Sequence, residues 1–163
     1  MTRRLNPSMK TKTLGLTLLL SIAAGTICFA DPNPTLGTWK LNESKSQFGE
    51  GMGKGQMVVW EQSGSDDKCT VDGVDAEGKK THTVWTGKLD GKDYPITGDA
   101  TSDMRSFKVN ADKSIEMISK KDGKTVGEGK IVVAPDGKTR TVTNTMTNAK
   151  GAKVMSSSAY DKS

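Results

Sequence analysis

The chain has 163 residues, of which 33% are hydrophobic and 26% are charged, and its formal net charge is +5. Four basic residues precede the first acidic one, and the rest of the chain carries twenty Lys and Arg against nineteen Asp and Glu. Because lysines and acidic residues alternate in that part, no clustered basic face is expected, and nucleic acid is excluded as a partner.

The first thirty residues have the composition of an export signal. The basic residues that open the chain are Arg3, Arg4, Lys10 and Lys12. An apolar run follows at 14–25, and small residues precede Asp31. This order predicts a signal peptide at residues 1–30, removed by cleavage after Ala30. We therefore expect an exported bacterial protein, periplasmic or secreted, with a single domain at residues 31–163.

No membrane anchor is expected. The apolar run at 14–25 is shorter than the roughly 20 residues that a helix needs to cross a bilayer. Cys28 follows Ile27, where a lipid-attachment signal would place a small residue. Removal of the leader would leave Cys69 as the remaining cysteine, so no internal disulfide is predicted.

Beyond the leader, the strongest pattern is a series of turn signals. They lie at 77–79, 90–92, 111–114, 122–124, 136–138 and 148–151. Most contain Asp-Gly or a related pair, which supplies the positive φ of a tight hairpin. The segments between the turns are short and alternate without a helical period, at 57–63, 68–74, 81–89, 104–109, 114–119, 125–133, 139–147 and 153–160. This rhythm predicts an all-β fold, a single up-and-down antiparallel barrel of eight to ten strands.

Alternation also assigns the faces of the predicted strands, because successive side chains of a strand point to opposite sides. We assign the face with the larger apolar residues to the interior. The residues placed inward by this rule are Cys69, Val71, Trp85, Leu89, Arg105, Phe107, Val109, Ile115, Met117, Gly127, Gly129, Ile131, Val133, Arg140, Val142, Asn144 and Met146. The two glycines among them either make room inside the barrel or allow the bends that closure requires.

The first predicted strand begins with Gly37-Thr38-Trp39, after a lead-in that contains proline. Together with the hairpins that follow, this start resembles the lipocalin (calycin) pattern, in which the indole lies across the closed end of the barrel. The resemblance implies a structural role for Gly37 and Trp39. The stretches "GTWKLN", "SKSQF" and "DGKDYPITG" are also similar to a group of small exported bacterial lipocalin-like proteins.

One feature departs from the lipocalin pattern. Lipocalins place an arginine of the last strand against that tryptophan, and the predicted last strand at 153–160 has none. Either Arg140, one strand earlier, takes its place, or the chain is more similar to the ten-stranded fatty-acid-binding branch.

Candidate catalytic groups are few. His82 is the single histidine, so a multi-histidine metal or haem site cannot be built from this chain. Cys69 and His82 are a conceivable nucleophile and base, but they are predicted on opposite faces. Acidic pairs lie in turns, where Asp is favoured for backbone reasons. We therefore expect no enzyme, no metal and no cofactor.

Two functions stay open. In the first, the barrel carries a hydrophobic or amphipathic small molecule, including an anionic one. Arg105 and Arg140 would then hold the anionic head, since a guanidinium suits a carboxylate or phosphate, and Trp60, Trp85 and Phe107 would cover the apolar part. In the second, the barrel is filled and serves as a structural or stress-related interaction protein of the cell envelope. Both arginines would then lie at the barrel rims, with Arg140 stacked on Trp39.

Overall fold

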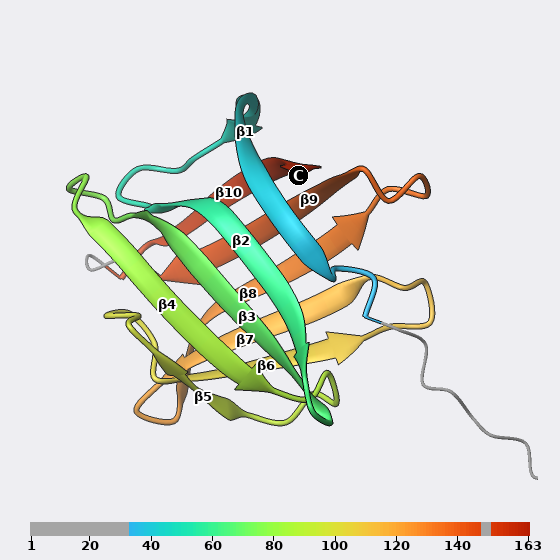
Figure 1. Ribbon diagram of the computed structural model, residues 1–163. Coiled ribbons are helices and arrows are strands. Elements are labelled where there is room, and N and C mark those ends of the chain that lie inside the picture. The colour runs from blue at the N-terminus through green and yellow to red at the C-terminus, as the bar shows by residue number, and fades with distance from the viewer. Residues whose placement is uncertain (1–32, 148–150) are drawn as a thin grey trace, which may run out of the picture. The chain divides into compact units, whose positions relative to one another are not determined.

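The computed structural model describes residues 33–147 and 151–163, and this part of the chain forms ten strands (Figure 1). They are β1 (Gly37–Gln47), β2 (Lys54–Ser63), β3 (Asp66–Val74), β4 (Lys80–Gly87), β5 (Tyr94–Thr97), β6 (Met104–Val109), β7 (Ile115–Lys121), β8 (Lys124–Val133), β9 (Thr139–Thr147) and β10 (Lys153–Lys162). The predicted signal peptide at residues 1–30 lies outside the described residues. Among the described residues, no helix is long and apolar enough to cross a membrane.

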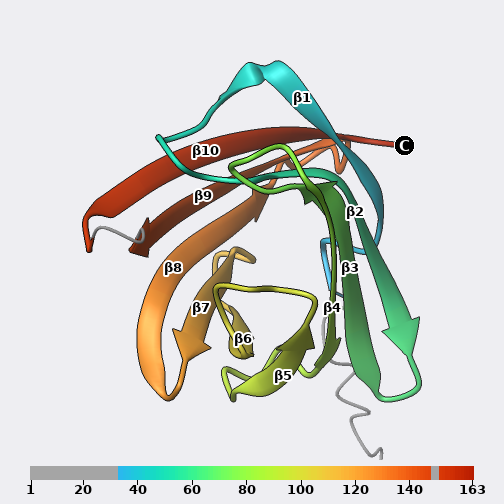
Figure 2. The same ribbon diagram turned by 90° about the vertical axis from the view of Figure 1, so that its left-hand side faces the viewer.

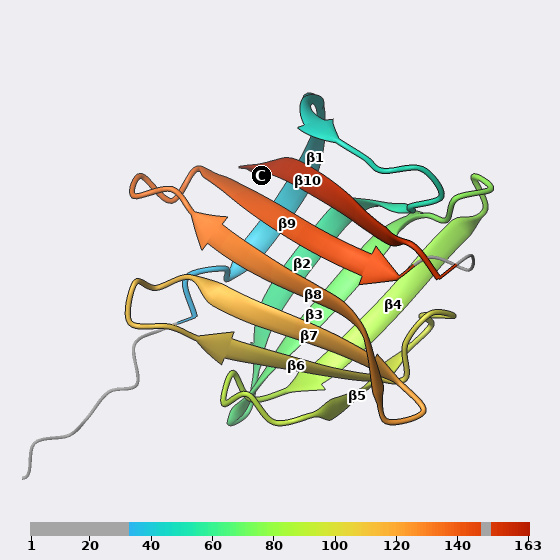
Figure 3. The ribbon, with the colours of Figure 1, turned by 180° about the vertical axis from the view of Figure 1, so that it is seen from behind.

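Each strand pairs antiparallel with the next, and β1 pairs with β10 to close the barrel. Figure 2 shows the strands curving around one interior, and Figure 3 shows β6 to β9 side by side on the other side of the barrel. The predicted all-β, up-and-down antiparallel barrel is therefore confirmed, with ten strands. Alternation did not predict β5, because this strand has four residues and includes Pro95.

A two-residue turn joins β7 to β8 through Asp122 and Gly123. Both residues have a positive φ, 50° and 75°. This is the backbone that a two-residue hairpin loop requires, and Asp-Gly is among the pairs that adopt it most readily. The turn signal at 122–124 therefore has a direct structural cause.

The strands place their apolar residues inward, as alternation predicted. The buried core includes Trp39, Trp60, Trp85, Phe107, Ile115 and Ile131. Aromatic rings form the centre of this cluster. The ring centroid of Phe107 lies 5.0 Å from that of Trp60 and 4.7 Å from that of Trp85, both in edge-to-face arrangement. Such pairs stabilise a core beyond the area they bury.

The seam between β1 and β2 is only partly paired. The ladder joins Gly37 to Trp60 and continues to Lys40, and beyond that point β1 separates from β2 and follows β10 (Figure 1). A groove of about 460 Å³ lies there, open to the outside. Its lining residues are Lys40, Leu41, Glu43, Gln56, Met57 and Asp72.

Candidate functional site

Polar side chains lie inside the barrel, among them the two arginines that alternation assigned to inward faces. The two predicted arginines lie on β6 and β9, each beside an inward apolar residue, and both are largely buried. Buried serines from β7 and β10 face the same interior: Ser119, Ser156 and Ser158. The interior therefore holds two cations among hydroxyl groups, in addition to the aromatic cluster.

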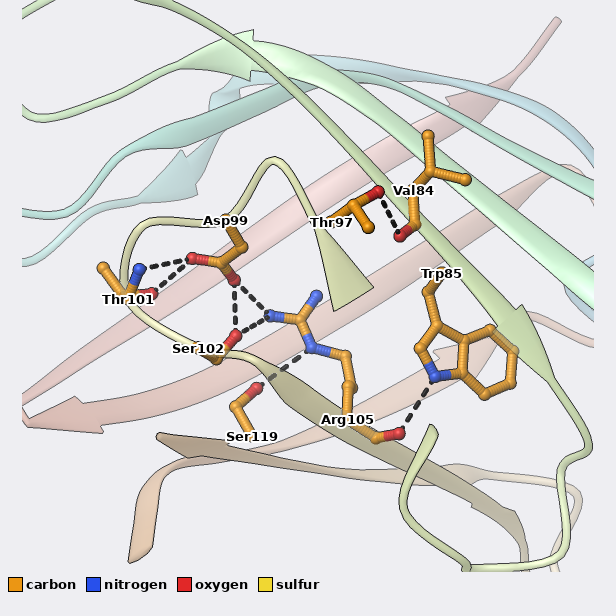
Figure 4. A network of polar contacts seen from close by, with 8 residues as sticks. All are labelled: Val84, Trp85, Thr97, Asp99, Thr101, Ser102, Arg105 and Ser119. Atoms are coloured by element: carbon orange, nitrogen blue, oxygen red, sulfur yellow. Dashed lines mark hydrogen bonds and ion pairs between the residues drawn. The ribbon is translucent and has the colours of Figure 1, made fainter. Parts of the chain in front are cut away.

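Arg105 belongs to a closed network of hydrogen bonds (Figure 4). Its Nη2 donates to Asp99 Oδ2 at 2.9 Å, and its Nε donates to Ser119 Oγ at 3.0 Å. Asp99 also accepts hydrogen bonds from Thr101 and from the hydroxyl of Ser102 at 2.6 Å. Arg105 thus has a carboxylate partner of its own, contributed by the loop between β5 and β6.

The electrostatics of this network follow from burial and pairing. Burial raises the pKa of Asp99, but hydrogen bonds from Ser102 and Thr101 and the charge of Arg105 outweigh it, so the pKa lies below the usual value. Burial lowers the pKa of Arg105, and the Asp99 carboxylate opposes that change. Both groups are charged at neutral pH and stabilise each other.

Arg140 has a different environment. Its side chain is 3% exposed, and the guanidinium carbon lies 4.8 Å from the ring centroid of Trp39 and 4.8 Å from that of Tyr160. Its Nε and Nη1 are buried and have no hydrogen-bond partner among the residues that the structure describes. Burial lowers its pKa to about 10, opposed by Tyr160 and Cys69, so the group is still a cation at neutral pH. Two aromatic faces hold this charge in place of a carboxylate.

The barrel end around Trp39 contains the predicted Gly-x-Trp motif. Trp39 is fully buried, and its Nε1 donates to the carbonyl oxygen of Thr35 at 2.7 Å. Gly37 has a φ of 113°, which favours glycine, and an added Cβ would lie 2.9 Å from Lys162 Cε. Lys162 of the last strand also places its Nζ 5.1 Å from the Trp39 ring centroid. Arg140 and Lys162 together occupy the role for which the resemblance implied a last-strand arginine.

The other predicted ligand-binding residues are three aromatic side chains, and the structure brings them together. Trp60, Trp85 and Phe107 pack on one another within the core, and their contact with a ligand stays a prediction. Trp85 also donates from its Nε1 to the carbonyl oxygen of Arg105 at 2.9 Å (Figure 4). It therefore links the aromatic cluster to the strand that carries this arginine.

Cys69 and His82 do not meet. Cys69 is buried opposite Trp85 in the ladder, whereas His82 pairs with Asp72 on the outer face at 2.6 Å. Burial raises the pKa of the Cys69 thiol to about 12, although the charges of Arg140 and Arg105 lower it. The thiol is therefore protonated and a poor nucleophile. Within residues 33–147 and 151–163, no group of three His, Cys, Asp or Glu side chains could hold a metal ion.

Sequence reasoning missed two partners of the arginines. Asp99 lies in a loop and reads as an ordinary turn residue, so nothing local marks it as the partner of Arg105. Tyr160 could have been found, because Ser156, Ser158 and Tyr160 share the inward face of β10 by simple alternation.

No protein-family model matches the chain, and no curated protein matches it. One matching solved structure is the S-type phycobiliprotein lyase CPES from Guillardia theta, with 12% identity and a TM-score of 0.49. The match covers 80% of this chain and 89% of that chain. At this identity the likeness concerns the fold alone. The closed, ten-stranded antiparallel barrel itself is shown by the strand order.

The expectation that this protein is not an enzyme is corrected here. The matched chain is named a lyase, which speaks against that expectation, and catalysis is not excluded for this chain. The separation of Cys69 from His82 removes only the mechanism that would use this pair.

Proposed function

We propose that the barrel binds a small amphipathic anion in its interior and that Arg140 holds the anionic group. The observation that carries this proposal is the buried guanidinium of Arg140, two of whose nitrogens lack a hydrogen-bond partner among the described residues. A buried charge costs free energy unless it is paired and hydrogen-bonded. A ligand carboxylate or phosphate would supply both the charge and the acceptors.

The geometry around Arg140 supports an anion rather than a neutral ligand. The guanidinium lies over the rings of Trp39 and Tyr160, and its Nε and Nη1 are left to donate to a ligand. A guanidinium presents a planar fork of donors that matches a carboxylate or a phosphate. Arg105 is already paired with the Asp99 carboxylate, so its part in binding the anionic group would be smaller than that of Arg140.

The apolar part of the ligand would contact the aromatic cluster of Trp60, Trp85 and Phe107. These rings are almost completely buried, and they pack edge to face. Binding would therefore require them to shift against one another rather than to line a space that is already open. This cost favours a ligand of modest size.

Export completes the proposed function: the protein would act in the periplasm or outside the cell. The basic start and the apolar run of the first thirty residues support this proposal. Mass spectrometry of the protein isolated from its natural host should find an N-terminus at Asp31. A mature chain that retains the leader would contradict export.

The binding test uses a fluorescent fatty-acid analogue titrated into the wild type and into three variants. Arg140→Gln should weaken binding about tenfold or more, because a charge-assisted hydrogen bond is lost. Arg105→Gln should weaken it less. Lys162→Gln is the matched control, since Lys162 also stacks on Trp39 but is exposed, and it should bind as the wild type does.

Two observations favour a second function. The guanidinium of Arg140 lies over the Trp39 ring, as expected for a filled barrel. The close packing of the aromatic cluster is what a filled barrel with a structural or envelope interaction role would show. Absence of saturable binding by the wild type at tens of micromolar would favour this alternative. Equal affinity of the wild type and Arg140→Gln would instead contradict the role given to Arg140.

A further inference from the structure

A second buried polar atom on β9 lacks a partner. Asn144 Oδ1 is buried and has no hydrogen-bond partner within the part of the chain that the structure describes. Asn144 lies four positions after Arg140 in the same strand, so both side chains face the interior. The donors of Arg140 and the acceptor of Asn144 are therefore left open on one face of one strand.

The residues around Asn144 leave room for its amide. Its ladder neighbour on β8 is Gly129, and a Cβ added to this glycine would collide with Asn144 Oδ1. Its neighbour on β10 is Ser156, which is 5% exposed. An amide oxygen in such a place loses its water, and a buried acceptor without a partner costs about 1–3 kcal/mol.

On the β8 side of β9 the stretch between the two polar groups is apolar, whereas on the β10 side the neighbour of Val142 is the buried Ser158. Val142 separates them on β9, and its ladder neighbour on β8 is Ile131, followed on β7 by Ile115. All three are buried. Four residues of a strand span about 13 Å between the Cα atoms of Arg140 and Asn144. Toward β8 and β7 the interior thus offers an anion-binding end, an apolar middle and a hydrogen-bond acceptor, in that order.

We propose that the ligand is a hydroxylated amphipathic anion, whose hydroxyl donates to Asn144 Oδ1 while its anionic group binds Arg140. This rests on the proposed function and narrows it. A plain fatty acid would satisfy Arg140 but would bring a methyl end to the amide, which would stay unpaired. A hydroxyl on the far part of the ligand satisfies both ends of the site. Asn144 is then a specificity-determining residue.

The test compares two probes that differ by one hydroxyl, decanoate and its ω-hydroxy derivative. Their affinities are measured by isothermal titration calorimetry with the wild type, with Asn144→Leu and with Thr141→Val. Leu has a similar volume but no acceptor. Thr141 is exposed on the outer face of the same strand, so its variant is the matched control.

The wild type should bind the hydroxylated probe about five- to tenfold more tightly than decanoate, which is the effect of one buried hydrogen bond. Asn144→Leu should bring this ratio to about one while decanoate affinity is kept or improved, and Thr141→Val should preserve the wild-type ratio. Equal affinities of the wild type for the two probes, or a preference that persists in Asn144→Leu, would overturn the inference and leave anion binding in place. If neither probe binds the wild type, the inference and the proposed function are both wrong.

Discussion

Arg140 and Tyr160 face each other in the β9–β10 ladder, with the guanidinium 4.8 Å from the ring centroid, and the hydroxyl of Tyr160 donates to the carbonyl oxygen of Gly55 at 2.9 Å. One tyrosine therefore holds the buried cation with its ring and reaches β2 with its hydroxyl. Gly55 lies on β2 beyond the residues that pair with β1, so this hydrogen bond crosses the unpaired part of the seam.

The two functions of Tyr160 can be separated. Tyr160→Phe keeps the ring on Arg140 and removes the bond to Gly55, so it should lower the free energy of unfolding by about 1 kcal/mol with unchanged anion affinity. Tyr160→Leu removes the ring as well and should also weaken anion binding. Urea denaturation and titration of the fluorescent fatty-acid analogue measure the two effects. Loss of affinity in Tyr160→Phe would show that the hydroxyl, rather than the ring, supports the site.

The two arginines should respond in opposite ways to replacement by methionine. Arg105→Met leaves Asp99 buried without its cation and should lower the free energy of unfolding by about 3 kcal/mol. Arg140→Met removes a buried charge that has no carboxylate partner among residues 33–147 and 151–163, so it should stabilise the protein by about 1 kcal/mol. Thermal and urea denaturation provide the comparison. A large loss of stability in Arg140→Met would mean that stacking on Trp39 and Tyr160 outweighs the cost of burying the charge.

Asp99 should make stability depend on acid pH. Its folded pKa is lower than the usual value of 3.8, so the unfolded chain takes up the proton first as the pH falls. The stabilisation is thus complete above about pH 4 and is lost as the pH falls through the folded pKa. The difference in free energy of unfolding between the wild type and Asp99→Asn should be constant at neutral pH and shrink below that range. Glu61→Gln, on the exposed part of β2, controls for the loss of one acidic charge; a difference that stays constant down to pH 2 would contradict this account.

Trp39→Ala should be strongly destabilising. The indole is fully buried and hydrogen-bonded to Thr35, and removing a buried tryptophan costs about 3–5 kcal/mol. Met155→Ala is the control, because Met155 is 69% exposed and its loss should change the unfolding free energy by less than about 0.5 kcal/mol. Chemical denaturation of both variants checks the prediction. Equal stability of Trp39→Ala and the wild type would show that the indole does not contribute to the core.

The fold could be predicted from sequence because its signals are local. Turn residues determine where each hairpin reverses, and the two-residue period of a strand determines which side chains face inward. Thus the alternation in β9 was enough to place Arg140 beside Val142 inside the barrel. β5 was not predicted, because four residues are too few to show a two-residue period.

The candidate site depended on contacts that no local pattern encodes. Asp99 binds Arg105 from a loop, and Ser119 completes the network from β7. Alternation gives the face of a residue but not its partner across the interior. The sequence could therefore predict that both arginines point inward, but not that one is paired and the other is held only by aromatic rings.

Because β5 has only four residues, we expect the barrel to open locally at this strand first. β5 pairs with β4 through Val84–Thr97 and Trp85–Ile96, and with β6 through two further pairs, whereas β9 and β10 share nine. A strand joined by so few ladder bonds would fray readily, since opening it breaks little of the sheet. The Arg105–Asp99 ion pair secures the loop that follows β5, so a buried side-chain bridge replaces the missing backbone bonds. Amide hydrogens of β5 should exchange with solvent sooner than those of β9, and Arg105→Met should accelerate that exchange locally before the rest of the barrel is affected.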